Sequence, residues 1–407
     1  MTAPRIGSTF LDVKKLLGGI ALFLAAAVAF ASDLPGLVQA NNGFAFSLFS
    51  RVSQSPAAQN IFMSPYSVSV AVQMLCNGAA GKTRVEIQGA LNIKDLPQDE
   101  INGYYKELNS SLTSQTNVAL DLANSIWLNR GFELKPAFLA TNEASFGAML
   151  GSVNFETPES ADLINRWAAD STRGKITDVV SFPFPADTEA ILANAIYFKG
   201  EWAERFDQRL THTRYFYLAG GMIKQTPMMS RHGEFQYEEG DGFQAVELPY
   251  AGNRFQMILF LPATNSSPAK MLAPFNGKIW NDRILPGFSS REGAVVFPKF
   301  KLNCKLLLNR PLQALGMQDA FVPGTANFAG MSSDPLYVSE VLQKSFVDVN
   351  EQGTEAAAVT IVSIRTNMVM EPLNPFEMIV DRPFFFVISD KSTGAILFMG
   401  VVNDPTH

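Results

Sequence analysis

Few side chains in this sequence have the types and spacing that enzymes use. The chain of 407 residues has three histidines, His212, His232 and His407, and none has a second histidine at the spacing of a metal site. The motifs H-E-x-x-H, C-x-x-C, G-x-S-x-G and G-x-G-x-x-G do not occur. Gly81-Lys82-Thr83 suggests a phosphate-binding loop, but that motif needs another glycine at position 76, where Cys76 stands. We therefore expect no enzyme activity, no metal and no cofactor.

One stretch, residues 347–386, has instead the composition of a loop that can become a strand. From Gly353 onward, about thirty residues lack turn signals, and connections of that length are usually functional or disordered. Small or β-branched residues alternate through its first part, namely Thr354, Ala356, Ala358, Thr360 and Val362. A face of this kind would fit between two existing strands, beneath a covering helix, without overpacking. No proline interrupts residues 353–370, so an inserted strand would lose no ladder hydrogen bond.

Seven motifs, in the same order along the chain, resemble those of the serpins, a family of serine protease inhibitors. They are NIFMSPYS at 60–67, GAAGKT at 78–83, INRW with GKI at 164–176, LANAIYFKGEW at 192–202, NEQGTEAAA at 350–358, DRPF at 381–384 and FMG at 398–400. The resemblance implies an α+β serpin fold with three β-sheets, eight to nine helices and an exposed reactive-centre loop at about residues 353–380. The resemblance covers almost the whole chain after residue 31.

The resemblance also implies a mechanism of suicide inhibition. A target protease cleaves the loop and forms an acyl-enzyme, after which the freed part of the loop inserts into the main sheet and traps the enzyme. The hinge that would insert comprises Glu351, Gly353, Thr354, Glu355, Ala356, Ala357, Ala358 and Thr360. Its inward-facing residues are small and uncharged, while Glu355 belongs to the alternate face. We therefore predict an inhibitory member of the family.

The cleaved bond is predicted from the family spacing after Gly353, which places it between Asn367 and Met368. The loop is a few residues longer than usual, so alternatives remain at Arg365, Val369 and Met370. Cleavage at Met368 would suit chymotrypsin-like, elastase-like or subtilisin-like enzymes, whereas cleavage at Arg365 would suit trypsin-like ones. The expected partner is a serine protease bound as a covalent acyl complex, with a cysteine protease as the alternative.

Other positions match residues that control sheet opening in the family. They are Ser64, Ser67 and Asn194 beneath the sheet, and Lys299, Glu351 and Trp202 at its top. Gln343 departs from the pattern, because many serpins have histidine there. An amide can both donate and accept hydrogen bonds, but the pH response of a histidine would be lost. Ordinary core packing is the alternative role for all of these residues.

Residues 1–31 have the pattern of a signal peptide. Arg5, Lys14 and Lys15 precede an apolar run over 16–30, and Ala29-Phe30-Ala31 supplies the small residues of a cleavage site. The apolar run is short for a membrane span, so cleavage is favoured over an uncleaved anchor. We therefore expect a secreted or periplasmic protein that has no membrane contact after cleavage. Bacterial export is favoured over eukaryotic secretion.

The rest of the chain, residues 32–407, is predicted to be a single domain and a monomer, because no linker or repeat interrupts it. The formal net charge is −6, and removal of a leader of charge +2 would leave −8. Such a balance, without a Lys/Arg run, argues against nucleic acid as a partner. Cys76 and Cys304 allow at most one disulfide, and the apolar helical pattern around Cys76 favours a free thiol.

Helical patterns dominate the first part of the mature chain. One helix is expected to begin at Ser64-Pro65, and an amphipathic helix is expected over 160–172. Strand patterns include 196–198, 235–237, 245–248 and 255–261. The lack of regular βαβ alternation favours an α+β fold.

Two other functions are possible for such a chain. A non-inhibitory serpin could act as a binding, carrier or chaperone protein, but it would be expected to have bulky or charged hinge residues. A hydrolase of unknown type has no motif in its favour.

Overall fold

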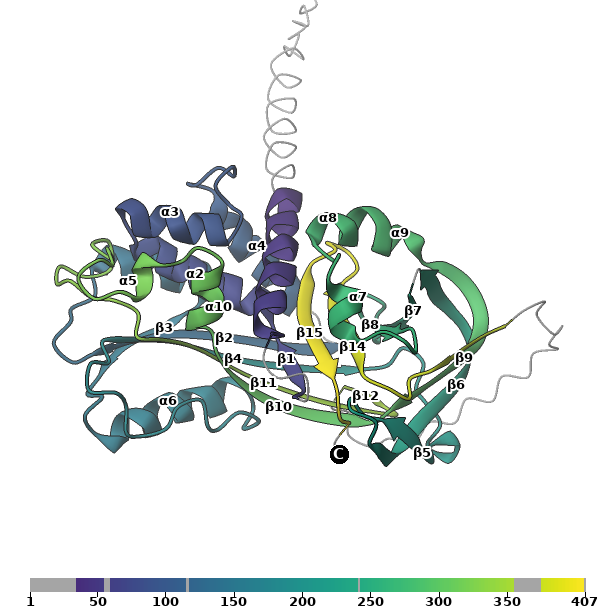
Figure 1. Cartoon of the computed structure of the whole chain (residues 1–407). Coiled ribbons are helices and arrows are strands. Elements are labelled where there is room, and N and C mark those ends of the chain that lie inside the picture. The colour runs from purple at the N-terminus through teal and green to yellow at the C-terminus, as the bar shows by residue number, and fades with distance from the viewer. Residues whose placement is uncertain (1–33, 55–58, 115–116, 241, 355–374, 406–407) are drawn as a thin grey trace, which may run out of the picture.

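The computed structural model describes residues 34–54, 59–114, 117–240, 242–354 and 375–405. Figure 1 shows a long sheet with helices on both faces, joined at one end to a second, strongly curved sheet. The first sheet has six strands in the order β10-β11-β12-β4-β2-β3. The second has nine, in the order β1-β15-β14-β8-β7-β6-β9-β13, with β5 paired to β6. No helix in the described ranges is long and apolar enough to cross a membrane.

The six-stranded sheet contains two parallel pairings, and the one between its central strands β11 and β4 is called the seam. Its strands are β2 (Val118–Asn129), β3 (Met149–Val153), β4 (Ala190–Glu201), β10 (Phe300–Leu307), β11 (Glu340–Asn350) and β12 (Gly353–Thr354). Strands β11 and β4 run parallel and pair directly from Glu340 opposite Ile191 to Phe346 opposite Tyr197. Strands β10 and β2 flank this pair with antiparallel ladders.

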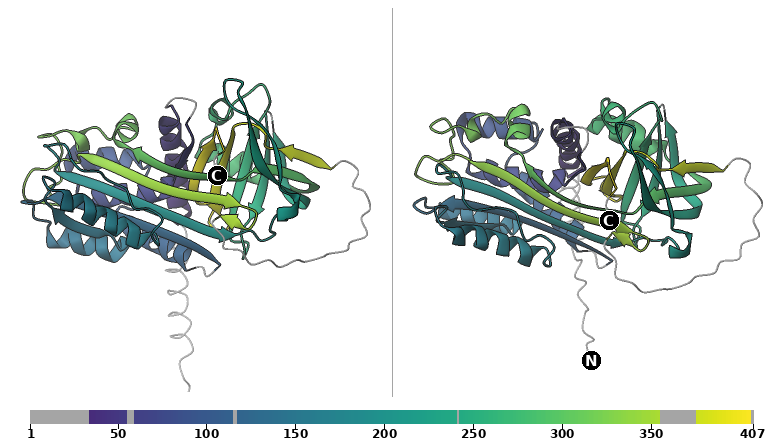
Figure 2. Two further views of the ribbon diagram at one scale, coloured as in Figure 1. Left: turned by 90° about the horizontal axis from the view of Figure 1, so that it is seen from below. Right: turned by 60° about the horizontal axis from the view of Figure 1, so that its bottom comes forward.

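The nine-stranded sheet is continuous because one long strand is shared between its two parts. Its members are β1 (Ile61–Met63), β5 (His212–Tyr217), β6 (Ile223–Gly240), β7 (Phe243–Pro249), β8 (Phe255–Pro262), β9 (Ser289–Pro298), β13 (Phe376–Ile379), β14 (Phe384–Asp390) and β15 (Ile396–Val402). Strand β6 pairs first with β5, then with β9 and finally with β7. The resemblance implied three sheets; in the described residues, hydrogen bonds through β6 join two of them. Figure 2 shows β13 at the outer edge.

Helices cover both faces of the six-stranded sheet. The first helix spans 34–52. The others are α2 (Pro65–Gly78), α3 (Gly81–Ala90), α4 (Ile101–Thr113), α5 (Pro136–Phe146), α6 (Pro158–Ser171), α7 (Pro268–Leu272), α8 (Gly277–Ile279), α9 (Leu285–Gly287) and α10 (Asn309–Ala314), with short 3₁₀ or π turns at Gln208–Leu210, Trp280–Ile284 and Asp319–Phe321. Helices α2 to α5 lie on one face of the sheet and α6 on the other (Figure 1).

Helix α2 begins where the sequence predicts. The Ser64 side chain caps it by accepting a hydrogen bond from the backbone amide of Ser67, and Pro65 occupies the first turn. The amphipathic helix expected over 160–172 is α6, and the four predicted strand segments lie within β4, β6, β7 and β8. Prediction was accurate here because capping residues and apolar periodicity are local signals.

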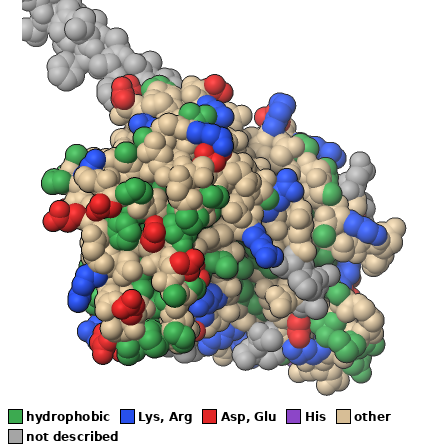
Figure 3. Space-filling view, turned by 60° about the vertical axis from the view of Figure 1, so that its left-hand side comes forward, with side chains coloured by type: hydrophobic (Ala, Val, Ile, Leu, Met, Phe, Trp, Pro, Cys, Tyr) green, Lys and Arg blue, Asp and Glu red, His purple; other side chains and the backbone are tan. Residues whose placement is uncertain are grey.

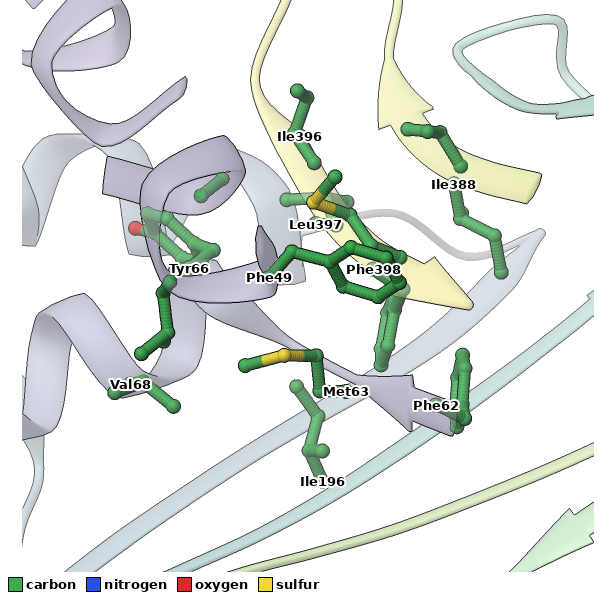
Figure 4. Packing of buried hydrophobic residues seen from close by; sticks show 14 of the residues in the cluster. Phe49, Phe62, Met63, Tyr66, Val68, Ile196, Ile388, Ile396, Leu397 and Phe398 are labelled. Carbon is green, nitrogen blue, oxygen red and sulfur yellow. The ribbon is translucent and has the colours of Figure 1, made fainter. Parts of the chain in front are cut away.

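Two hydrophobic clusters pack against the six-stranded sheet. The larger one fills the space between this sheet, the nine-stranded sheet and the first helices; within it, Phe62, Met63, Ile196 and Phe398 lie close together (Figure 4). The smaller one lies under α6 and includes Ala193 and Ala195 of β4. Those alanines alternate with Asn194, so β4 presents small residues to α6 and a polar side chain to the opposite face. On the surface, acidic and basic side chains are interspersed, as Figure 3 shows for one face.

Candidate functional site

At one end of the six-stranded sheet, β12 separates two strands that elsewhere pair with each other. Gly353 and Thr354 lie opposite Asn350 and Val349 of β11. On their other side, the same two residues pair with Glu201 and Gly200 of β4. A strand that continued beyond Thr354 along this line would have to part the β11–β4 seam. The β11–β4 ladder therefore begins where β12 ends.

Gly353 is required by its backbone conformation and by a close approach. Its φ is +150°, and a Cβ at this position would lie 2.1 Å from the carbonyl oxygen of Gly200. Any other residue would overlap the β4 backbone. The hinge therefore enters the sheet at a point where only glycine fits.

Thr354 is fully buried against an aromatic pair. Its Oγ1 lies 2.7 Å from the hydroxyl of Tyr250. The Tyr250 ring stacks on Trp202, with centroids 4.7 Å apart and an angle of 12° between the planes. Burial raises the pKa of Tyr250 well above its ordinary value, so this hydroxyl stays protonated and available for the hydrogen bond. The first inserted side chain therefore has a polar partner inside the sheet.

The turn between β11 and β12 is held by a network around Glu351. Lys299 Nζ lies 3.0 Å from Glu351 Oε2, and Thr211 Oγ1 donates to Oε1 at 2.8 Å. Burial raises the pKa of Glu351, but hydrogen bonds from its own backbone amide, Lys299 and Thr211 outweigh that effect and leave the pKa below its ordinary value. Trp202 donates from Nε1 to the carbonyl of Asn350 at 2.9 Å. The residues predicted for the top of the sheet therefore meet around the hinge.

A second network lies under the middle of the seam, where Gln343 and Asn194 are directly opposite each other. Gln343 Nε2 donates to Asn194 Oδ1 at 2.6 Å and to the Ser64 carbonyl at 2.9 Å, and its Oε1 accepts from Ser64 N at 2.9 Å. Asn194 Nδ2 donates to Ser67 Oγ and, at 2.7 Å, to Asn124 Oδ1. The amide of Gln343 thus connects both strands of the seam to the cap of α2.

The far end of the predicted loop is anchored by Phe376 in β13. Its ring stacks on Tyr237 with centroids 3.9 Å apart, and Gly293 opposite it has no side chain to block the ring.

Other predicted residues lie outside the described part of the chain. These are Glu355, Ala356, Ala357, Ala358, Thr360, Arg365, Asn367, Met368, Val369, Met370 and the leader at 1–31.

Sequence reasoning missed Tyr250, Thr211, Asn124 and Phe376. None of them lies in a motif, and their contacts join positions more than a hundred residues apart or depend on strand register.

The two cysteines are both unpaired, and burial raises the pKa of Cys76 to about 11, so its thiol is unreactive. Among the described residues, no group of histidine, cysteine or carboxylate side chains has the arrangement of a metal site.

The fold consists of a six-stranded sheet, in which β12 lies between the ends of β11 and β4, joined to a nine-stranded sheet. A family model of the serpins (serine protease inhibitors) matches residues 39–405. Glia-derived nexin of Rattus norvegicus is 34% identical over 88% of this chain and 91% of its own length. Leukocyte elastase inhibitor of Homo sapiens is 32% identical over 91% of this chain and 99% of its own length. The solved structure of human thyroxine-binding globulin aligns with a TM-score of 0.84 and 27% identity. The alignment covers 92% of this chain and 100% of the globulin chain. The chain belongs to the serpin family.

Proposed function

We propose that this protein is a secreted or periplasmic inhibitor that traps serine proteases by strand insertion. The observation that carries the proposal is β12, because Gly353 and Thr354 already occupy the first two positions between β11 and β4. After cleavage within 355–374, the segment that follows Thr354 is free to extend this strand. The covalently bound enzyme then moves with it. The protein acts once and is consumed.

The seam sets the cost of that movement. Extension of β12 replaces the direct ladder between residues 340–346 of β11 and 191–197 of β4 with two new ladders. It also breaks the bond between Gln343 and Asn194, which lies in the middle of the seam. The gain is a complete set of antiparallel hydrogen bonds on both sides of the inserted strand. This balance supports a native state that is stable until the loop is cut.

The proposed target is a protease with an apolar specificity pocket, cutting between Asn367 and Met368. The name of one relative, leukocyte elastase inhibitor, supports this choice over a trypsin-like target. The second candidate function is that of a carrier, which the likeness to thyroxine-binding globulin favours. The small side chains of the hinge and the buried position of Thr354 support the inhibitor.

The test is incubation of the mature protein with chymotrypsin, elastase, subtilisin and trypsin, followed by denaturing gels and mass spectrometry of the released peptide. We expect an SDS-stable complex and a peptide that begins at Met368. Thr354→Arg should abolish the complex and leave a cleaved chain, since inserting that charge next to Tyr250 is costly. Cleavage of the wild-type chain without a complex, and without a gain in heat stability, would favour the carrier.

A further inference from the structure

An open cavity lies at the outer edge of the six-stranded sheet. Its volume is about 870 Å³, and its walls come from the end of the first helix, from β1, from β10 and from α10. Strand β10 is the outermost strand of the sheet, and none of the described residues that line the cavity belongs to β11, β12 or β4. Cavities of about 300–1,000 Å³ are typical of small-molecule sites. The size of this one therefore fits a ligand of low molecular weight, away from the seam.

The apolar part of the cavity lining is aliphatic. Val52, Ile61 and Leu308 are buried, and Leu306 packs against the larger hydrophobic cluster. No aromatic side chain is present among the described residues that line the cavity. A flexible hydrocarbon chain can follow such a surface, and its burial there is favourable because apolar area is removed from water.

Hydrogen bonds to distant segments hold the walls of the cavity. Asn60 Nδ2 donates to the carbonyl of Asp404 at 2.6 Å, and Asn60 Oδ1 accepts from the amide of Asn403 at 2.7 Å. The amide of Leu308 donates to the carbonyl of Val341 at 2.8 Å, which fixes the start of α10 to the neighbouring strand β11. The site is therefore formed before any ligand arrives, as is usual for small-molecule sites.

The charged part of the lining is entirely basic. Arg51 and Arg310 belong to it, and neither guanidinium group has a hydrogen bond or an ion pair in the described part of the chain. Lys305 is a third cation, but it pairs in register with Lys344 on the face of the sheet that α6 covers. No described lining residue is acidic, although the whole chain has 38 acidic and 32 basic residues. The two arginines can bind a carboxylate through paired N–H donors.

We propose that this cavity binds an aliphatic carboxylate, with its hydrocarbon chain against Val52, Ile61 and Leu306 and its carboxylate paired with Arg51 and Arg310. A free fatty acid has this chemistry. Binding needs neither a protease nor cleavage within 355–374, so the site is independent of the proposed function. The ligand contacts the first helix, β1, β10 and α10 together, and it therefore stabilises the folded chain.

Titration calorimetry of the uncleaved mature protein with decanoate, at concentrations where decanoate is monomeric, tests the proposal. Decanol has the same chain length without the charge, and butanoate has the charge with a short chain. We expect one saturable decanoate site, about tenfold weaker binding of decanol and no measurable binding of butanoate. The melting temperature should rise with decanoate concentration.

The double variant Arg51→Gln with Arg310→Gln identifies the site. It should bind decanoate about tenfold more weakly than wild type but decanol equally well, because only the contacts to the carboxylate are lost. Arg166→Gln with Arg214→Gln is the matched control, since it changes the net charge by the same amount and both residues lie outside the cavity lining. All four arginines are exposed, so each variant should fold as wild type does.

Three results would overturn the inference. The first is the absence of saturable decanoate binding to wild type. The second is equal affinity of wild type for decanoate and decanol, because the arginines would then not recognise the carboxylate. The third is the same decanoate affinity in the two double variants, because the ligand would then bind elsewhere on the molecule. Since no protease is present, none of these results bears on whether the protein traps an enzyme.

Discussion

The hydroxyl groups of Tyr250 and Thr354 lie 2.7 Å apart in a fully buried site, where β12 enters the six-stranded sheet. This bond joins the start of the insertable segment to a tyrosine that also stacks on Trp202. It therefore links the hinge to an aromatic pair between β4 and β7.

Replacing Tyr250 with phenylalanine should weaken this attachment without creating a cavity. Thr354 Oγ1 would lose its partner while remaining buried, which costs about 1–2 kcal/mol of the free energy of unfolding. Urea unfolding of the native protein measures the change. Trp202→Phe is a useful comparison, since it removes the bond to the Asn350 carbonyl and leaves the Tyr250–Thr354 bond in place. A Tyr250→Phe protein as stable as wild type would show that the bond does not hold β12.

Gly353→Ala tests whether β12 can form with any other residue at its start. A Cβ there would lie 2.1 Å from the Gly200 carbonyl oxygen, so the hinge should be displaced at a cost of about 2 kcal/mol. Gly131→Ala is the matched control, because Gly131 also has a positive φ, +116°, but nothing within 4 Å of an added Cβ. Urea midpoints of the two variants separate steric overlap from backbone strain. An equal loss of stability in Gly353→Ala and Gly131→Ala would rule out the steric overlap as the cause.

The Glu351 network predicts a defined dependence of stability on pH. The pKa of Glu351 is lowered in the folded state from its ordinary 4.5, so its contribution is fully present above pH 4.5 and is lost as the pH falls through the folded pKa. At pH 7, the free energy of unfolding of Glu351→Gln should be about 1–3 kcal/mol lower than that of wild type, because the variant loses charged hydrogen bonds to Lys299 and Thr211.

The difference between wild type and Glu351→Gln should narrow as the pH falls below about 4.5. Lys278→Gln serves as control, since its pair with Asp282 is exposed and surface pairs contribute little. A gap between wild type and Glu351→Gln that stays constant from pH 7 to pH 3 would contradict the role of the carboxylate charge.

How much of this molecule the sequence predicts depends on how local each signal is. Ser64-Pro65 predicts the start of α2, because a cap and a proline act within one turn. The alternating small residues after Gly353 predict a segment that can enter a sheet; of these residues the structure describes only Thr354, in β12, so that for the others this stays a prediction. The family resemblance predicts that Lys299, Glu351 and Trp202 lie together at the top of the sheet, and the structure brings them together.

The residues that the sequence did not reveal are those whose role depends on register between distant strands. Tyr250 meets Thr354 only because β4 ends beside the bend that follows β7, and Phe376 meets Tyr237 only through β9.

Gln343 gives the last prediction, because this chain has a neutral amide at a position where many serpins have histidine. Its described neighbours Ser64 and Asn194 are uncharged, and its side chain is fully buried. In Gln343→His, burial should lower the pKa of the imidazole below its ordinary value of about 6.5. A histidine with a lowered folded pKa stabilises the protein above its unfolded pKa, and this contribution is lost as the pH falls. The free energy of unfolding of the variant should therefore fall progressively below that of wild type, measured in parallel, as the pH decreases from 7.5 to 5.5.

Gln343→Asn, which cannot titrate, is the control, and its free energy of unfolding should differ from that of wild type by a constant amount over this range. Parallel curves for the histidine and asparagine variants would show that a charge is tolerated under the seam.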